Sequence, residues 1–178
     1  MALDSDTLAQ FLDALDRFVK ERLIPNEALV ADDDAIPPAL VQEIREMGLF
    51  GMSIPEEYGG LGLTMAEEVQ AAFVLGQTSP VFRSLVGTNN GIGSQGIIID
   101  GTAEQKAKYL PALASGDMIA SFALTEPDAG SDAGSLRTTA RRDGDDFILN
   151  GTKRYITNAP RADVFTVFAR TNAAANGS

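Results

Sequence analysis

The sequence of 178 residues contains no cysteine and no histidine. Without cysteine there are no disulfides, no thiolate nucleophile and no cysteine-ligated metal. Without histidine the chain lacks the most common general base and the most common metal ligand. Any chemistry must therefore use carboxylates, hydroxyls, backbone groups or a bound cofactor. This excludes most hydrolases and metalloenzymes, and we expect no metal site.

Long apolar runs and a basic leader are also missing. No run approaches the roughly 20 apolar residues that a membrane-spanning helix needs. The first residues, Met1 to Asp4, lack the basic region and apolar stretch of a signal peptide. We therefore expect a soluble, cytoplasmic protein without a membrane span. The net charge of −11 argues against nucleic acid as a partner, because phosphates repel an acidic surface.

Apolar residues recur at helical spacing up to about residue 118, which predicts five or six helices. The first is expected over residues 5–23 and to end at Pro25. The acidic run 32–34 is expected to be a solvated loop rather than a metal site. A second helix is expected after Pro38 and to stop at Gly48.

Two capping boxes predict the starts of later helices. In each, a threonine is followed three residues later by Glu or Gln, at Thr64 and at Thr102. Apolar residues after Thr64 are expected to face the core: Ala66, Val69, Ala72 and Phe73.

Beyond residue 118 the pattern changes to that of strands and turns. Strands are expected over residues 118–125, 136–142, 147–150 and 164–170, with a hairpin turn at Gly144 and a further extension of the sheet over 153–157. The fold class is therefore α+β: an all-α helical domain over 1–117, then an incomplete antiparallel β domain over 118–178. So few strands cannot close a barrel, and an apolar last strand leaves an edge that needs cover.

Two segments of the β part carry candidate binding groups. Residues 122–132, Phe-Ala-Leu-Thr-Glu-Pro-Asp-Ala-Gly-Ser-Asp, run from a strand end into a turn. Gly130 permits close approach of a ligand, and Thr125 and Ser131 offer hydroxyls beside backbone N–H groups. Such a turn can hold a phosphate or the polar edge of a heterocycle, although a surface loop with capping hydroxyls has the same composition. Residues 151–159, taken alone, fit an ordinary amphipathic strand.

The order of the motifs tells more than either segment alone. Thr-Glu-Pro-x-Ala-Gly-Ser-Asp from Thr125 is followed by Asn-Gly-x-Lys from Asn150 and Tyr-Ile-Thr-Asn from Tyr155. With the glycine-rich run 48–62 and the run 101–111, this order resembles the acyl-CoA dehydrogenase family over residues 5–172. The family fold has an N-terminal helical domain, a middle β domain and a C-terminal helical bundle. The resemblance implies that this chain stops inside the middle domain.

The resemblance implies FAD as the cofactor. Thr125 would hydrogen-bond the pyrimidine side of the flavin, and Thr157 would place its hydroxyl at flavin N5. Ser131 would contact the pyrophosphate and lie near the acyl-CoA substrate. Tyr155 stands where most members of the family carry tryptophan, so its contact with the flavin is smaller. The full set of implied cofactor-binding residues is Phe122, Ala123, Leu124, Thr125, Gly130, Ser131, Tyr155, Ile156 and Thr157.

The implied reaction is the FAD-dependent α,β-dehydrogenation of an acyl-CoA thioester in fatty acid metabolism. Electron-transfer flavoprotein is the implied acceptor, and the full-length protein is implied to be a homotetramer. The family's catalytic base is a glutamate of the C-terminal bundle, so no catalytic residue is expected in this chain. Glu126 is expected to stabilise its turn. Alternatives are an acyl-CoA oxidase, a nitroalkane oxidase, a flavin monooxygenase, or a non-catalytic helical interaction fragment.

Overall fold

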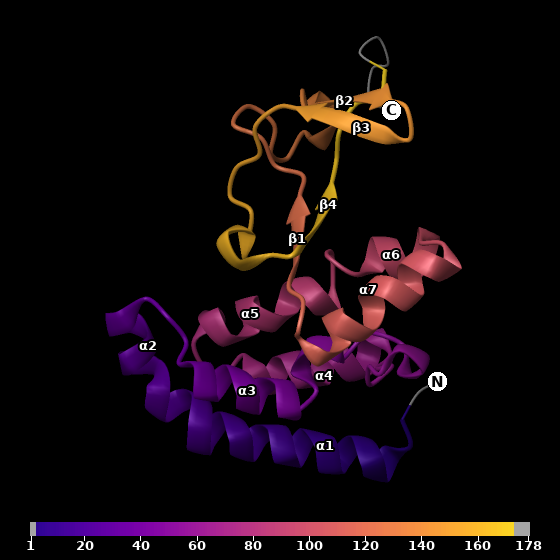
Figure 1. The fold of residues 1–178 in the computed structure, drawn as a ribbon. Coiled ribbons are helices and arrows are strands. Elements are labelled where there is room, and N and C mark those ends of the chain that lie inside the picture. The colour runs from indigo at the N-terminus through magenta and orange to yellow at the C-terminus, as the bar shows by residue number, and fades with distance from the viewer. Residues whose placement is uncertain (1–2, 173–178) are drawn as a thin grey trace.

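The computed structural model describes residues 3–172. Seven α-helices in this part of the chain gather into one body, and four strands rise from it (Figure 1). The predicted fold class is confirmed: a helical first part precedes a partial β part. The helices are α1 Ser5–Phe18, α2 Glu27–Asp33, α3 Pro38–Glu46, α4 Met65–Leu75, α5 Pro80–Asn90, α6 Gln95–Asp100 and α7 Ala103–Ser115; the strands are β1 Ala120–Ala123, β2 Thr139–Asp143, β3 Asp146–Asn150 and β4 Val164–Val167.

The first helix covers the predicted residues 5–23 but is less regular than the sequence predicts, and the helical path continues beyond it. Asp4 caps α1 by accepting a hydrogen bond from the backbone of Thr7 at 3.0 Å. The helix then continues through a π-helical turn, Val19–Leu23. Pro25 does not end the helical path, because it fits the first turn of a short 3₁₀ helix that leads into α2. The acidic run was wrongly predicted as a loop, since α2 extends to Asp33 before Asp34 turns the chain with a φ of 50°.

Three predicted helix boundaries are confirmed. Both capping boxes form, at Thr64 and at Thr102. Gly48 follows the end of α3 in the left-handed conformation, with a φ of 71°. The glycine after α7 matters in the same way: Gly116 has a φ of 77°, and a Cβ there would lie 2.5 Å from the ring of Phe50. Only glycine allows the chain to turn there from α7 towards β1.

The helical body contains two apolar cores. The larger one lies among α1, α3, α4 and α5 and includes Leu15, Phe50 and Phe82, each almost fully buried. The smaller one lies beneath β1 and consists of Ile54, Leu110, Leu113, Ala114 and Ala120, with partly buried neighbours. Burial of these side chains is the main stabilising contribution, at roughly 25 cal/mol per Å² of apolar surface. The second core makes β1 part of the helical body.

The predicted inner face of α4 is wrong. Glu67, Ala71 and Leu75 are the buried residues of this helix, and α4 packs on α1 through that face. The cause is that α4 carries apolar residues on more than one face, so spacing alone does not choose between them. Glu67 helps to determine which face of α4 is buried, because its carboxylate also accepts a hydrogen bond from the backbone of Leu3 at 2.8 Å. The predicted inward residues are instead exposed: Ala66, Val69, Ala72 and Phe73.

The strands form two separate two-stranded sheets. β2 and β3 make the predicted antiparallel hairpin around Gly144, with Asp143 opposite Asp146. β1 and β4, in contrast, pair in parallel, with Ala120 opposite Val164. The prediction of a wholly antiparallel arrangement is therefore wrong: the hairpin and a following loop return the chain to the start of β1 before β4 begins (Figure 1).

The predicted extension of the sheet over residues 153–157 is also wrong. These residues form no strand, and Tyr155 has a φ of 58°, which a strand does not allow. Between residues 3 and 172 we find no helix with the length and apolar character needed to cross a membrane.

Candidate functional site

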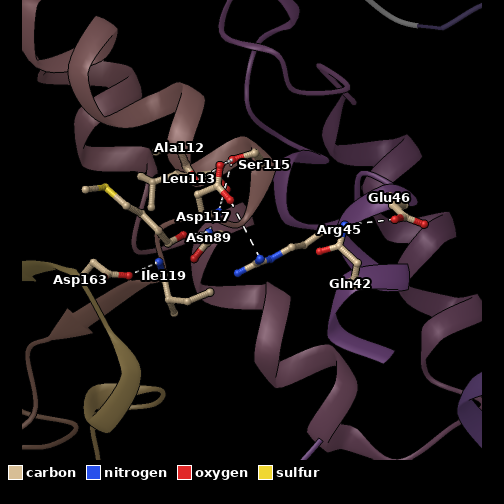
Figure 2. Close-up of polar contacts among 11 residues, drawn as sticks. Gln42, Arg45, Glu46, Asn89, Ala112, Leu113, Ser115, Asp117, Ile119 and Asp163 are labelled. Carbon is tan, nitrogen blue, oxygen red and sulfur yellow. Dashed lines mark hydrogen bonds and ion pairs between the residues drawn. The ribbon is translucent and has the colours of Figure 1, made fainter. Parts of the chain in front are cut away.

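A buried asparagine fixes the base of the site. The Asn89 side chain is fully buried, and its Nδ2 donates to the carbonyls of Leu113 at 2.9 Å and Met118 at 2.8 Å. Its Oδ1 accepts from the backbone N–H of Ala120 at 2.7 Å. Close by, the backbone N–H of Ile119 donates a hydrogen bond to the carboxylate of Asp163, the residue before β4, at 2.9 Å (Figure 2). These contacts join α5, α7, β1 and the start of β4.

The chain beyond β1 forms the predicted turn. Glu126 and Ala129 exchange backbone hydrogen bonds of 2.9 and 3.3 Å. The next two residues, Gly130 and Ser131, are exposed, and a Cβ at Gly130 would meet no atom within 4 Å. The turn therefore presents bare backbone and a hydroxyl to the space beside it. We call residues 122–131 the Thr125 segment.

Glu126 holds this turn in place. Its carboxylate accepts hydrogen bonds from the backbone of Arg137 at 2.5 Å, the backbone of Thr138 at 2.8 Å and Nζ of Lys153 at 2.9 Å. Burial raises the pKa of Glu126, but the hydrogen bonds from Thr138, Arg137 and Lys153 outweigh it and lower the pKa to about 2. A carboxylate with so low a pKa, and with this many donors, is a poor proton acceptor at neutral pH.

A second segment lies against the first. We call residues 155–157 the Thr157 segment. Lys153 donates from Nζ to the carbonyl of Leu124 at 3.0 Å, and the backbone of Arg154 donates to the carbonyl of Thr125 at 2.8 Å. The hydroxyl of Ser121 donates to the carbonyl of Thr157. The two segments are thus side by side, as predicted, but isolated hydrogen bonds join them rather than an antiparallel ladder.

The Thr157 segment is anchored to the helical body at its far end. Asn158 has a φ of 63°, and its Nδ2 donates to the carbonyl of Ser84 at 3.0 Å and to Oγ1 of Thr88 at 2.9 Å, both on α5. The ring of Tyr155 is 78% exposed, with the guanidinium of Arg154 4.4 Å from its centre. The segment therefore has a fixed backbone and an aromatic ring open to a ligand.

Three hydroxyls of the predicted site make no hydrogen bond within residues 3–172. They belong to Thr125, Ser131 and Thr157. Each of these side chains is exposed or half-buried, so a ligand can reach it. Unused hydroxyls on two segments with fixed backbones are suited to the polar edge of a heterocycle or a phosphate.

The other predicted residues contribute differently. The side chain of Ala123 is buried, and its carbonyl accepts from the backbone of Phe168 at 3.1 Å. The ring of Phe122 meets that of Phe168 edge to face, with centroids 5.1 Å apart. These contacts support the segment from behind. Leu124 and Ile156 are half-buried beside them.

Sequence reasoning gave no role to the residues that hold the two segments together. They are Ser121, Lys153 and Asn158, which join the Thr157 segment or its flanks to β1, the Thr125 segment and α5. Lys153 is the last residue of the Asn-Gly-x-Lys motif, but its hydrogen-bond partners lie almost 30 residues away in the sequence. Nothing local indicates such a contact.

A cavity of about 300 Å³ opens beside Thr157. It lies along α5, at the point where Asn158 anchors the Thr157 segment. Its lining residues are Arg83, Ser84, Gly87, Thr88, Gly91, Ile92 and Thr157. The site thus combines unused hydroxyls with a space large enough for part of a small ligand.

Comparison with known proteins gives the family. The model of the acyl-CoA dehydrogenase N-terminal domain matches residues 5–117, and that of the acyl-CoA dehydrogenase middle domain matches residues 121–178. The chain belongs to the acyl-CoA dehydrogenase family. A curated relative of this family, (2S)-methylsuccinyl-CoA dehydrogenase of Cereibacter sphaeroides, is 42% identical over 94% of this chain and 30% of its own length.

Solved acyl-CoA dehydrogenase structures have the same fold. Glutaryl-CoA dehydrogenase from Mycobacterium smegmatis in complex with FADH2 is 40% identical, with a TM-score of 0.85 over 94% of this chain and 43% of that chain. A structure reported under the electron transferring flavoprotein of Acidaminococcus fermentans is 35% identical, with a TM-score of 0.87 over 97% of this chain and 45% of that chain. The chain thus spans less than half the length of these relatives. FAD, predicted from the motifs, is confirmed as a cofactor of this family.

Proposed function

We propose that residues 1–117 and 118–178 are the N-terminal domain and part of the middle domain of an FAD-dependent acyl-CoA dehydrogenase. The reaction is the α,β-dehydrogenation of an acyl-CoA thioester. The observation that carries the proposal is the set of unused hydroxyls of Thr125, Ser131 and Thr157, on two segments held side by side.

The residues present fit FAD. Thr125 offers a hydroxyl to the pyrimidine edge of the flavin, and Thr157 offers one to N5. The exposed turn at Gly130 and Ser131 offers backbone and a hydroxyl to the pyrophosphate. The exposed ring of Tyr155 would cover part of the flavin. Phe122, Ala123, Leu124 and Ile156 complete the binding surface, mainly by supporting it.

FAD, when bound, supplies a hydride acceptor at N5 for the β hydrogen of the acyl group. The chain contributes position and electrostatics. The neutral donors Thr125 and Thr157 would stabilise negative charge on a reduced flavin with little reorganisation, because their backbones are already held by hydrogen bonds. Ser131 is exposed, and by the family resemblance it would also contact the acyl-CoA.

Proton removal from the α carbon needs a carboxylate that this chain does not offer at its flavin segments. Glu126 is close to them, but it is bound by Lys153 and two backbone N–H groups, and its pKa is about 2. We propose that Glu126 holds the turn and that the base comes from outside these 178 residues.

Partners and assembly are also proposals. A likeness to the structure reported for the electron transferring flavoprotein of Acidaminococcus fermentans supports an electron-transfer flavoprotein as the acceptor. The homotetramer stays a prediction from the resemblance, and the cytoplasmic location stays a prediction from the first residues of the sequence.

Flavin binding tests the proposal. The chain is purified, incubated with FAD and titrated by calorimetry and by the visible flavin spectrum. We expect Thr157→Val to shift the flavin bands and to weaken binding by roughly fivefold to tenfold, for the loss of one hydrogen bond. Thr139→Val is the matched control, since its hydroxyl bonds only to the carbonyl of Asn150 within the hairpin.

Two results would count against the function. One is a wild-type chain that binds no FAD although its circular dichroism shows it folded, which would favour the non-catalytic fragment. The other is a Thr157→Val chain with an unchanged flavin spectrum. Rapid reaction of the reduced flavin with oxygen would instead favour the related oxidases and monooxygenases.

A further inference from the structure

The cavity beside Thr157 is lined by a charged side chain, which would not be required to bind a purely hydrocarbon acyl chain. Arg83 is the single charged side chain among the described residues that line it; the others are small, apolar or neutral polar. The whole chain carries a net charge of −11, with only 14 basic residues. Arg83 is an exposed residue, and it also lines this cavity together with Thr157, the predicted N5 contact, so a ligand in the cavity can meet its charge.

The position of the guanidinium is built into α5. Residue 87 is glycine, and Nη1 of Arg83 lies 2.9 Å from where a Cβ at that residue would be; Cζ lies 3.2 Å from it. Any larger residue would push the guanidinium away. Gly87 itself lines the cavity, so the guanidinium lies directly over the cavity wall.

The guanidinium has no close anionic partner in the described part of the chain. It makes no ion pair and no hydrogen bond there. Glu68 on α4 is near enough to feel its charge: burial raises the pKa of Glu68, and Arg83 partly opposes that rise. An arginine whose guanidinium N–H donors are unused is suited to bind a carboxylate through two parallel hydrogen bonds.

The site geometry determines which part of a substrate meets Arg83. The β carbon must lie at flavin N5, and Thr157 is the residue proposed to contact N5. Thr157 and Arg83 line the same cavity. The part of the acyl chain beyond the β carbon is therefore the part that can reach Arg83.

We propose that the substrate is the CoA thioester of a short dicarboxylic acid, and that Arg83 binds its distal carboxylate. This inference rests on the proposed function and names its substrate class. Two of the similar proteins support it through the acyl groups in their names, methylsuccinyl and glutaryl, each of which ends in a carboxylate, whereas other relatives are named for very long-chain acyl groups.

The test compares two ligands that differ only in the distal group. Glutaryl-CoA and pentanoyl-CoA have acyl chains of equal carbon number and the same CoA part, so any contact of Arg83 with CoA phosphates cancels. Calorimetric titration of the FAD-loaded chain is expected to show glutaryl-CoA bound about tenfold more tightly. The preference is expected to shrink at high salt.

Variants identify the residue responsible. Arg83→Met is expected to abolish the preference, and Arg83→Lys to keep part of it, because lysine keeps the charge but loses the paired donors. The control is Arg17→Met on α1, which removes an exposed arginine paired with Asp13 and is expected to change nothing.

Each outcome decides the question. Equal affinities in the wild-type chain, or a preference that survives Arg83→Met, overturn the role of Arg83 while leaving the flavin function intact. Failure to bind either acyl-CoA while FAD is bound overturns this inference alone, whereas failure to bind FAD overturns the proposed function and this inference with it.

Discussion

Nζ of Lys153 lies 2.9 Å from Oε1 of Glu126, and the two side chains are only 13% and 5% exposed. Lys153 also donates to the carbonyl of Leu124, and Glu126 also accepts from two backbone N–H groups. This ion pair links the Thr125 segment to the stretch of chain that leads to the Thr157 segment.

Breaking the pair from one side should be costly. Lys153→Met leaves the Glu126 carboxylate buried without its cation, and we expect a loss of about 3 kcal/mol in the free energy of unfolding. The double variant with Glu126→Gln should lose less than the two single changes added together, because it leaves no buried charge. Urea unfolding of the four proteins measures this. Strictly additive losses would mean that the two side chains do not interact.

Acid should weaken the fold through Glu126. Its pKa is about 2 in the folded chain against a reference value of 4.5. Since the folded pKa is the lower one, the stabilisation is fully present above about pH 4.5 and is lost as the pH falls towards 2. Urea midpoints measured across this range should fall less steeply in Glu126→Gln than in the wild type. Identical slopes would contradict the assignment.

Gly151 is predicted to be intolerant of any side chain. A Cβ there would lie 2.4 Å from Oγ1 and 2.7 Å from Cα of Thr138, which is itself buried. Gly151→Ala should therefore destabilise the chain by roughly 1–3 kcal/mol. Gly130→Ala is the matched change, since nothing lies near its Cβ, and it should stay within about 0.5 kcal/mol of the wild type in thermal unfolding.

Asn89 is expected to be the most sensitive polar residue of the helical body. Asn89→Leu keeps the volume but leaves the N–H of Ala120 and the carbonyl of Met118 without a partner, while the carbonyl of Leu113 keeps its hydrogen bond from Gly116; we expect a loss of about 2–4 kcal/mol. Hydrogen exchange at Ala120 should accelerate in this variant. Asn150→Ala, an exposed change in the hairpin, is the control. Equal stabilities of the two variants would contradict the role given to Asn89.

Sequence reasoning succeeded where the determinant is local. The capping boxes at Thr64 and Thr102 each act within one turn of helix, and Gly144 sets a two-residue hairpin. The α+β class follows from the change in apolar spacing near residue 118. The family follows from several motifs in a fixed order, which no single segment supplies.

Sequence reasoning failed where contacts between segments far apart in the sequence determine the local structure. Val69 and Phe73 were placed inward, but the packing of α4 on α1 buries the opposite face. The stretch around Tyr155 alternates like a strand, yet Lys153 and Asn158 bind partners about 30 and 70 residues away and impose a left-handed backbone. The Thr125 and Thr157 segments do lie side by side, as predicted, but isolated hydrogen bonds join them instead of the antiparallel strands that were expected.

The parallel pairing of β1 with β4 has a consequence for how the site forms. The two strands meet across more than 40 residues of chain, so the loop they close is long and must be ordered before their contacts repay its entropy. During synthesis the helical body is complete long before Val164 leaves the ribosome. The candidate site should therefore assemble late, on a scaffold that is already folded. In pulsed hydrogen exchange during refolding, the amides of β1 and the Thr157 segment should still exchange at times when those of α1 and α5 are already protected.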